Sequence, residues 1–303
     1  MKKLNVTFRG TEDATRYLFS FAKCLSAALR SGGYEEYADD IIASSGFAFR
    51  MWVDKTLCPS ATSIWSFHQQ KPWVENGGLL CEYTERLWGQ NAVEEKKRLE
   101  GLDIIKKSID NGMAAVVWDL SGAEWGLAIG YDDETSKLCT LKINEKEDFV
   151  PYEKLGKLDI PILSVLAVVG KAPKETSVLI ADTKKLAVSH LLGKEWCDNA
   201  KGLDAYDVLS DFVLQKLSAD TFWNLEYYLG TYCALKQYAW RFFQKYGEYE
   251  LAALYHAVYD AWKEAFDLKR AAKSVDVLPK EKIAALLLFA KAKECEAVAM
   301  MRE

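Results

Sequence analysis

The distribution of apolar positions changes along the chain, and in the first half it predicts a sheet. Two apolar runs, 114–120 and 125–131, are separated by a short Ser-Gly turn, a pattern typical of a β-hairpin. Neither run alternates regularly with polar residues, so both strands are expected to be covered on two faces. Further strands are predicted over 137–143 and 162–169, and the second of these is rich in Val and Leu, as central strands are.

Apolar residues at helical spacing predict several helices in the same half. Residues 13–30 carry an apolar stripe that includes Phe21 and Cys24, and Asp13 is placed to cap this helix. Further helices are expected over 35–43, 79–87 and 93–111.

The second half of the chain contains only helical patterns. A polar, proline-containing segment at 171–176 has the composition of a linker. Beyond it, helices are predicted over 183–192, 203–216, 221–246, 248–270 and 279–302. The sequence therefore predicts an α+β domain with an antiparallel sheet over 1–172, followed by an all-α antiparallel helical bundle over 177–303.

Composition and charge narrow the classes of partner. The chain has 303 residues, of which 50% are hydrophobic, enough apolar material for a core in each of two domains. The formal net charge is −5, and no basic stripe of the kind that binds nucleic acid is present. The first ten residues lack the apolar run of a signal peptide, and no segment is long and apolar enough to span a bilayer. We expect neither nucleic acid nor a membrane as a partner.

Cysteine and histidine usage bears on location and metal binding. The seven cysteines lie far apart without a C-x-x-C pair, and the three histidines lie in unrelated segments. This spacing fits neither a disulfide framework nor a zinc site. We therefore expect reduced cysteines, a cytoplasmic location and no metal or other cofactor. The sequence leaves the oligomeric state open.

Four segments carry a family resemblance: SFAKCLSAALRSGG at 20–33, SGFAF at 45–49, EWGLAIGYDDE at 124–134 and VPYEKLG at 150–156. In order and spacing they resemble the N-terminal domain of the butirosin biosynthesis protein H family. That family is similar to bacteriocin-processing peptidases, which have the papain-like cysteine-proteinase fold, and it follows this domain with a helical one. The resemblance implies a papain-like fold for residues 1–172.

The resemblance also assigns residues to catalytic positions. In catalytic members a Cys opens the first helix, where the helix N-terminus lowers the pKa of the thiol, and a His accepts its proton. Counting from the Leu-Arg at the end of the first helix puts Ser20 in the Cys position. Counting back from the Gly-Tyr dipeptide of the later strand puts Glu124 in the His position. Asn144, which follows that strand, is the candidate for the third, orienting position.

A serine–glutamate pair differs chemically from a thiolate–imidazolium pair. A hydroxyl is a weak nucleophile without a base, and a carboxylate with an ordinary pKa of about 4 is a weak base for it. Burial beside Trp125 would raise the pKa of Glu124. Two interpretations stay open for each residue. Ser20 is either a helical serine bonded to a nearby carbonyl or a pocket residue, and Glu124 is either an exposed acid at a turn or a carboxylate that binds an amine or guanidinium.

Cys24 is the rival nucleophile. It lies one helical turn after Ser20 and shares a face of the helix with it. The alternative is that Cys24 is a core residue of the apolar stripe, because a small thiol packs well in a core. His68 lies in a loop whose position relative to these residues the sequence does not give.

Three functions follow from these assignments. The first is a catalytically altered papain-like domain that binds a small amine, peptide or acyl ligand in the former active-site cleft, lined by Trp125, Phe47 and Phe49. The second, implied by the resemblance, is an acyltransferase that moves an acyl group from an acyl carrier protein to an amine, with Ser20 or Cys24 as nucleophile or acyl acceptor and Glu124 as base. The third is a cysteine peptidase that uses Cys24.

Overall fold

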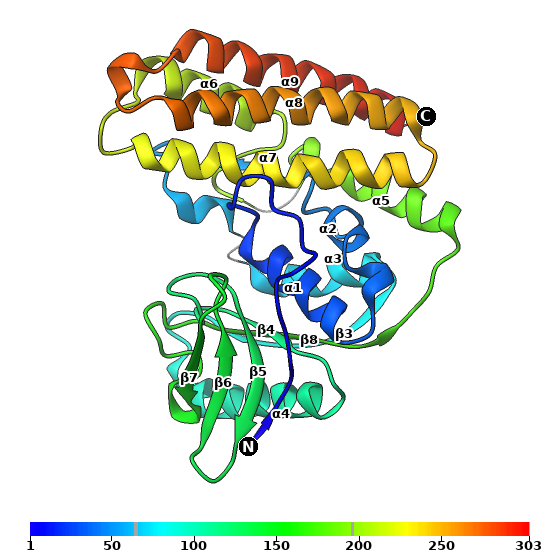
Figure 1. Cartoon of the computed structure of the whole chain (residues 1–303), viewed down its shortest axis with the longest axis vertical. Helices are drawn as coiled ribbons and strands as arrows, with labels where there is room; N and C mark the ends of the chain where they lie inside the picture. Colours follow the sequence, from blue (N-terminus) through cyan, green and yellow to red (C-terminus); the bar gives the residue numbers. More distant parts are fainter. Residues whose placement is uncertain (64–65, 195–196, 303) are drawn as a thin grey trace. The chain divides into compact units, whose positions relative to one another are not determined.

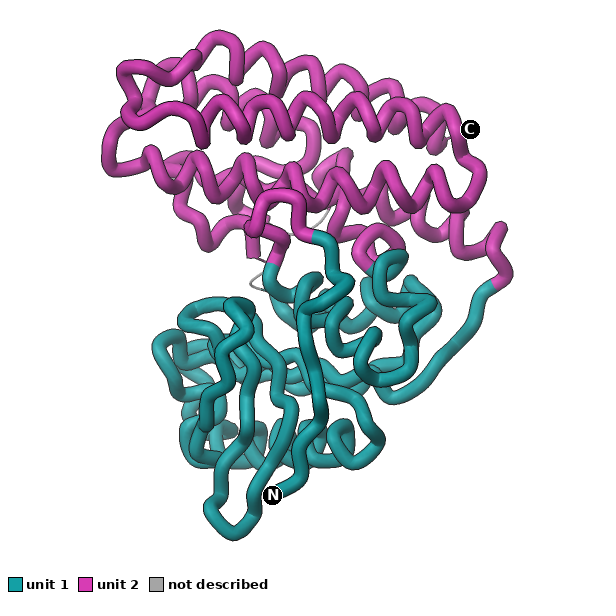
Figure 2. Tube along the Cα trace, viewed as in Figure 1, with its two compact units in different colours: residues 1–12, 20–41, 65–174 teal, residues 13–19, 42–64, 175–303 magenta. Residues whose placement is uncertain are grey.

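A computed structural model describes residues 1–63, 66–194 and 197–302 (Figure 1). The described residues form nine α-helices and an antiparallel sheet of seven strands, so the predicted α+β class is confirmed, as is the helical C-terminal region. The chain divides into two compact units (Figure 2). Unit 1 comprises residues 1–12, 20–41 and 65–174, and unit 2 comprises residues 13–19, 42–64 and 175–303.

The sheet belongs to unit 1. Its strands are β1 (Lys2–Lys3), β3 (Leu79–Arg86), β4 (Ala115–Val117), β5 (Gly126–Asp132), β6 (Lys137–Leu141), β7 (Glu147–Pro151) and β8 (Leu163–Lys171). Their order is β3-β8-β4-β5-β6-β7, with β1 paired to β5. The predicted hairpin is confirmed as β4 and β5, in which Ala115 lies opposite Ala128. The predicted central strand is confirmed as β8, which lies between β3 and β4.

Two predictions for unit 1 are wrong. Residues 79–87 were expected to be helical, but Leu79–Arg86 is strand β3. In its first four residues buried and exposed side chains alternate with the two-residue period of a strand, and β8 provides its hydrogen-bond partner. The sequence also predicts no strand between 143 and 162, but Glu147–Pro151 pairs with β6 as an edge strand whose acidic side chains face solvent.

Helices cover the sheet of unit 1. α4 (Glu94–Asp110), predicted over 93–111, buries Leu102, Ile105 and Ile109 in a core shared with strand residues such as Val117. α1 (Ser20–Ser31) packs against β4 and β5, and α3 (Gln70–Asn76) packs against β3.

The remaining helices are short and occur in both units. α2 spans Asp40–Ser44, and 3₁₀ helices span Glu35–Tyr37, Pro59–Thr62, Phe67–Gln69, Asn91–Val93, Tyr152–Lys154 and Val275–Val277.

The first long helix begins later than predicted. It was expected from residue 13, but α1 begins at Ser20. The Asp13 carboxylate accepts backbone N–H groups of Thr15 and Leu18 and so holds a turn in place of a helix cap. Arg16 has φ +70°, a left-handed conformation that an α-helix cannot contain.

The predicted helical bundle forms most of unit 2. Its helices are α5 (Thr176–Leu191), α6 (Asp204–Gln215), α7 (Phe222–Lys245), α8 (Tyr249–Ala271) and α9 (Lys280–Met301). Figure 1 shows α6, α7, α8 and α9 running alongside one another, with α8 packed on both α7 and α9. Among the described helices, none has the length and hydropathy that a membrane crossing requires.

Unit 2 also recruits segments that the sequence assigned to the first domain. One boundary between the units lies at 174–175, and residues 13–19 and 42–64 belong to unit 2 as well. Strand β2 (Trp52–Val53) pairs with β9 (Ala200–Lys201), and the Tyr232 hydroxyl of α7 bridges the backbone N–H and C=O of Trp52. These long-range backbone contacts have no signature in local hydrophobic periodicity.

Candidate functional site

Ser20 and Glu124 lie together in unit 1, although 104 residues separate them in sequence. Ser20 is the first residue of α1, and Glu124 lies just before β5. The Ser20 hydroxyl donates a hydrogen bond to the Glu124 carboxylate, and the backbone N–H of Trp125 donates to Ser20 Oγ over 3.3 Å. The structure therefore brings together the two residues that the resemblance places in the nucleophile and base positions.

A compact turn before β5 positions Glu124. The buried Asp119 carboxylate accepts the backbone N–H groups of Ala123 and Ile160, each over 2.7 Å. The Ser121 N–H donates to the Glu124 carbonyl over 3.3 Å and closes the turn. Burial raises the pKa of Asp119, while these N–H donors oppose the rise. Sequence reasoning missed Asp119; an Asp two residues before a Ser-Gly turn is the signal that could have found it.

An aromatic cluster supports the site from inside. The Trp125 ring centroid lies 5.0 Å from that of Phe21, 4.9 Å from Phe67 and 5.1 Å from Trp118. All four side chains are buried. Trp125 is thus fixed by packing, and its backbone holds Ser20 while its ring fills the core.

Some buried polar groups of unit 1 have no hydrogen-bond partner among the described residues. They include the indole Nε1–H of Trp125 and the side-chain amide of Gln70. Gln70 is fully buried and follows Phe67 by three residues, so the two side chains leave the chain on the same side. Gln70 was not singled out from the sequence, where nothing distinguishes it from an exposed helical glutamine.

The two members of the pair differ in accessibility. Ser20 is only 3% exposed, whereas Glu124 is partly exposed. The hydroxyl is therefore an interior group that holds the carboxylate, and the carboxylate is the group that a molecule arriving from solvent can reach. A carboxylate held by a hydroxyl donor is suited to accept a further hydrogen bond from a cation.

Cys24 has the surroundings of a core residue. It is fully buried on α1, and this burial raises the pKa of its thiol well above the ordinary value. The positive charge of Lys23 opposes the rise, and the negative charge of Glu124 adds to it. A thiol in this state is protonated at neutral pH, the opposite of an activated nucleophile.

Asn144 and His68 are engaged elsewhere in unit 1. Asn144 is exposed in the turn after β6, and its side-chain oxygen accepts the backbone N–H of Lys146 over 3.2 Å. His68 is exposed, with Nδ1 3.4 Å from a Glu85 carboxylate oxygen and Nε2 3.0 Å from the Gln69 amide nitrogen. Within the described residues, the structure records no hydrogen bond from either side chain to the serine–glutamate pair.

Phe47 and Phe49 belong to unit 2 and pack in its interior. The Phe47 ring lies 5.6 Å from Phe19, and the guanidinium of Arg50 lies 5.4 Å from it. The Phe49 ring lies 5.3 Å from Tyr255. Trp125, expected to line a cleft together with them, packs within unit 1. The structure therefore gives these three aromatics core positions in two different units.

The described residues contain no group of three His, Cys, Asp or Glu side chains placed to hold a metal ion. Comparison of the sequence with models of known protein families gives no match, and comparison with curated proteins gives no significant match.

Proposed function

We propose that unit 1 is a catalytically altered papain-like domain that binds a small amine or the amino end of a peptide through Glu124. The observation that carries the proposal is the hydrogen bond from the buried Ser20 hydroxyl to the partly exposed Glu124 carboxylate. It fixes an anionic acceptor at the head of β5, where the resembling enzymes carry their base.

Three features support binding over catalysis. The hydroxyl at the nucleophile position is nearly inaccessible, so a substrate carbonyl has little access to it. The nearby thiol of Cys24 is buried with a raised pKa. The imidazole of His68 contacts the Glu85 carboxylate, with 3.4 Å between Nδ1 and Oε1. A carboxylate with a fixed orientation provides a charge-assisted hydrogen bond to an ammonium group without any reaction.

Ligand-induced stabilisation of the full chain tests the proposal. The probes are n-butylamine, a dipeptide amide and, as a charge-reversed control, butyrate. A ligand that binds only the native state raises the free energy of unfolding by about 2.7 kcal/mol at one hundred times its Kd. We expect the two amines to raise the melting temperature and butyrate to leave it unchanged.

Two variants tie the effect to the site. Glu124→Gln keeps the shape of the side chain and removes its charge, and we expect it to weaken amine binding about tenfold or more. Glu134→Gln is the matched control, because Glu134 is an exposed acid in the turn after β5. Amines that fail to stabilise the native protein, or that bind Glu124→Gln as tightly as the native chain, would refute the proposal.

Acyl transfer is the second candidate, and the direction of the same hydrogen bond favours it. The Ser20 hydroxyl donates to Glu124, so that carboxylate is placed to take the proton if the Ser20 oxygen attacks a thioester carbonyl. The C–S bond of the thioester then breaks, and the same carboxyl group returns the proton to the departing thiolate. Incubation with a short-chain acyl thioester followed by intact-mass measurement distinguishes the candidates. A stable acyl adduct that is absent from Ser20→Ala would establish acyl transfer, and an unchanged mass is the result that the binding proposal predicts.

A further inference from the structure

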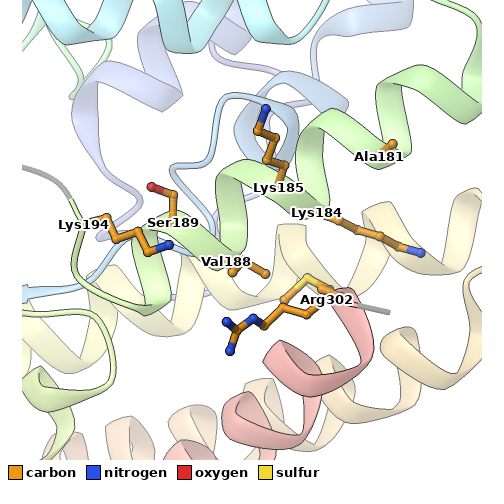
Figure 3. A pocket seen from close by; sticks show the side chains of 8 residues that line it. Ala181, Lys184, Lys185, Val188, Ser189, Lys194 and Arg302 are labelled. Atoms are coloured by element: carbon orange, nitrogen blue, oxygen red, sulfur yellow. The ribbon is translucent and has the colours of Figure 1, made fainter.

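A cavity of about 560 Å³ lies in unit 2, between α5 and the C-terminal end of α9 (Figure 3). Its volume falls within the roughly 300–1,000 Å³ typical of small-molecule sites. All the residues that line it belong to unit 2. It is separate in the chain from the serine–glutamate pair of unit 1, so nothing inferred for it depends on the function proposed above.

The polar lining of this cavity is cationic. Lys184 and Lys185 come from α5, Lys194 from the turn after it, and Arg302 from the end of α9. None of the described residues that line the cavity is acidic, although acidic residues outnumber basic ones in the chain, 44 to 39. Figure 3 shows the Arg302 guanidinium beneath Val188 and the Lys194 amine to the left of Val188, while the Lys185 amine points upward, away from both.

These cations differ in how they are compensated. Lys184 forms an ion pair of 2.8 Å with Glu248 of unit 2, so its charge is largely balanced. For Lys185, Lys194 and Arg302 the structure records no ion pair with any described residue, and all three are exposed. Concentrated positive charge for which the described residues provide no ion-pair partner attracts a small anion, and most strongly one that carries more than one negative charge.

The remaining lining indicates what the anion is attached to. Ser189 adds a hydroxyl that donates a hydrogen bond readily, while Ala181 and Val188 of α5 and Met301 of α9 form an apolar wall. The cavity is larger than a lone phosphate needs. Arginine and lysine together are the usual donors to phosphate oxygens.

We propose that the cavity between α5 and α9 binds a phosphorylated organic molecule of up to nucleotide size, with Lys194 and Arg302 contacting the phosphate oxygens and Val188 contacting the organic part.

Calorimetric titration of the full-length chain tests this proposal. The probes are ADP and glucose 6-phosphate, their uncharged counterparts adenosine and glucose, and inorganic phosphate. We expect at least one phosphorylated probe to bind more tightly than both its uncharged counterpart and inorganic phosphate. We also expect its affinity to fall as ionic strength rises.

Charge-reversal variants locate the site. Lys194→Glu and Arg302→Glu are each expected to weaken binding of that probe about tenfold or more, because each replaces an attraction with a repulsion. Lys273→Glu is the matched control, with the same charge change at an exposed lysine of unit 2 that does not line the cavity. The melting temperature of each variant shows whether it remains folded.

Four results would overturn the proposal. They are no binding of any phosphorylated probe, affinities of ADP and glucose 6-phosphate that both fail to exceed that of inorganic phosphate, equal loss of binding in Lys273→Glu, and retained binding when both Lys194 and Arg302 are reversed. Lys194 and Arg302 also lie near helix C-termini, where cations stabilise the helix by themselves. That purely structural role predicts a lowered melting temperature in the reversed variants and no bound phosphate in the native chain.

Discussion

Lys236 of α7 and Glu294 of α9 form an ion pair inside unit 2, with 2.6 Å between Nζ and Oε1 and no accessible surface on either side chain. The other carboxylate oxygen of Glu294 accepts the Tyr206 hydroxyl over 2.9 Å, and the Trp262 indole N–H donates to that hydroxyl. The bundle core thus contains a connected polar network that joins α6, α7, α8 and α9. Such a pair raises stability only while both charges are present.

We predict that Lys236→Met destabilises the protein by about 3–5 kcal/mol, because it leaves the Glu294 charge buried without its partner. The double variant Lys236→Met with Glu294→Leu is expected to recover most of that loss. Urea unfolding followed by circular dichroism measures both. Losses that simply add in the double variant would show that the two side chains do not interact energetically.

A second prediction concerns Gly46, which has φ +82° and lies against α5. A methyl group added here would collide with the His190 ring and with Leu186. We expect Gly46→Ala to cost about 2–4 kcal/mol, from left-handed strain together with overpacking. Gly247→Ala is the control, because its φ of +77° is similar but open space surrounds it. Strain alone is expected to cost about 1 kcal/mol there, and equal losses in the two variants would contradict the proposed collision.

A third prediction is a loss of stability in mild acid that originates at His190. Burial, together with the positive charges of Arg50 and Lys236, holds the pKa of His190 well below its ordinary value of 6.5. The unfolded chain therefore binds a proton near pH 6.5 that the folded chain does not bind. As the pH falls below 6.5, the free energy of unfolding decreases by roughly 1 kcal/mol per pH unit, and it is regained as the pH rises.

Chemical unfolding between pH 7.5 and 5 measures this slope. His190→Gln is expected to flatten it, whatever its effect on absolute stability. His256→Gln, at an exposed histidine of α8, is expected to leave it unchanged. A slope that is the same in the native chain and in His190→Gln would exclude His190 as the origin.

A fourth prediction concerns thiol reactivity. Cys58 and Cys295 are exposed, whereas Cys24 is buried with a raised pKa. Under native conditions iodoacetamide is expected to modify Cys58 and Cys295 first and to reach Cys24 only when the protein unfolds. Peptide mass mapping over time measures the order. Rapid modification of Cys24 in the folded protein would revive the cysteine peptidase hypothesis.

The sequence predicts the bounds of α6, α7, α8 and α9 to within one residue, whereas α5, predicted over 183–192, begins seven residues earlier, at Thr176. α7, predicted over 221–246, spans Phe222–Lys245. Short elements were predicted less well. Leu79–Arg86 is long enough for either structure, and its strand conformation depends on pairing with β8 from far along the chain. That pairing is a tertiary effect that local propensity does not contain.

The candidate site, too, could be predicted from the sequence only in part. The proximity of Ser20 and Glu124 could be anticipated, because a resemblance in register carries spatial information across the intervening chain. The residues that surround this pair could not be anticipated from the sequence. Nothing local to Cys24 distinguishes a thiol in the first turn of a helix from one packed in a core, and the lining of the cavity in unit 2 is assembled from residues as distant as Lys184 and Arg302.

The interleaved course of the chain bears on how such a protein arises and how it can be dissected. A simple fusion of two genes gives a single boundary between the two encoded domains. Here unit 2 consists of residues 175–303 together with the earlier segments 13–19 and 42–64. A truncated protein that begins at residue 175 lacks the Trp52 backbone that the Tyr232 hydroxyl bridges. It also lacks strand β2, with which Ala200–Lys201 pairs. Neither compact unit can therefore be produced by cutting the gene at a single position.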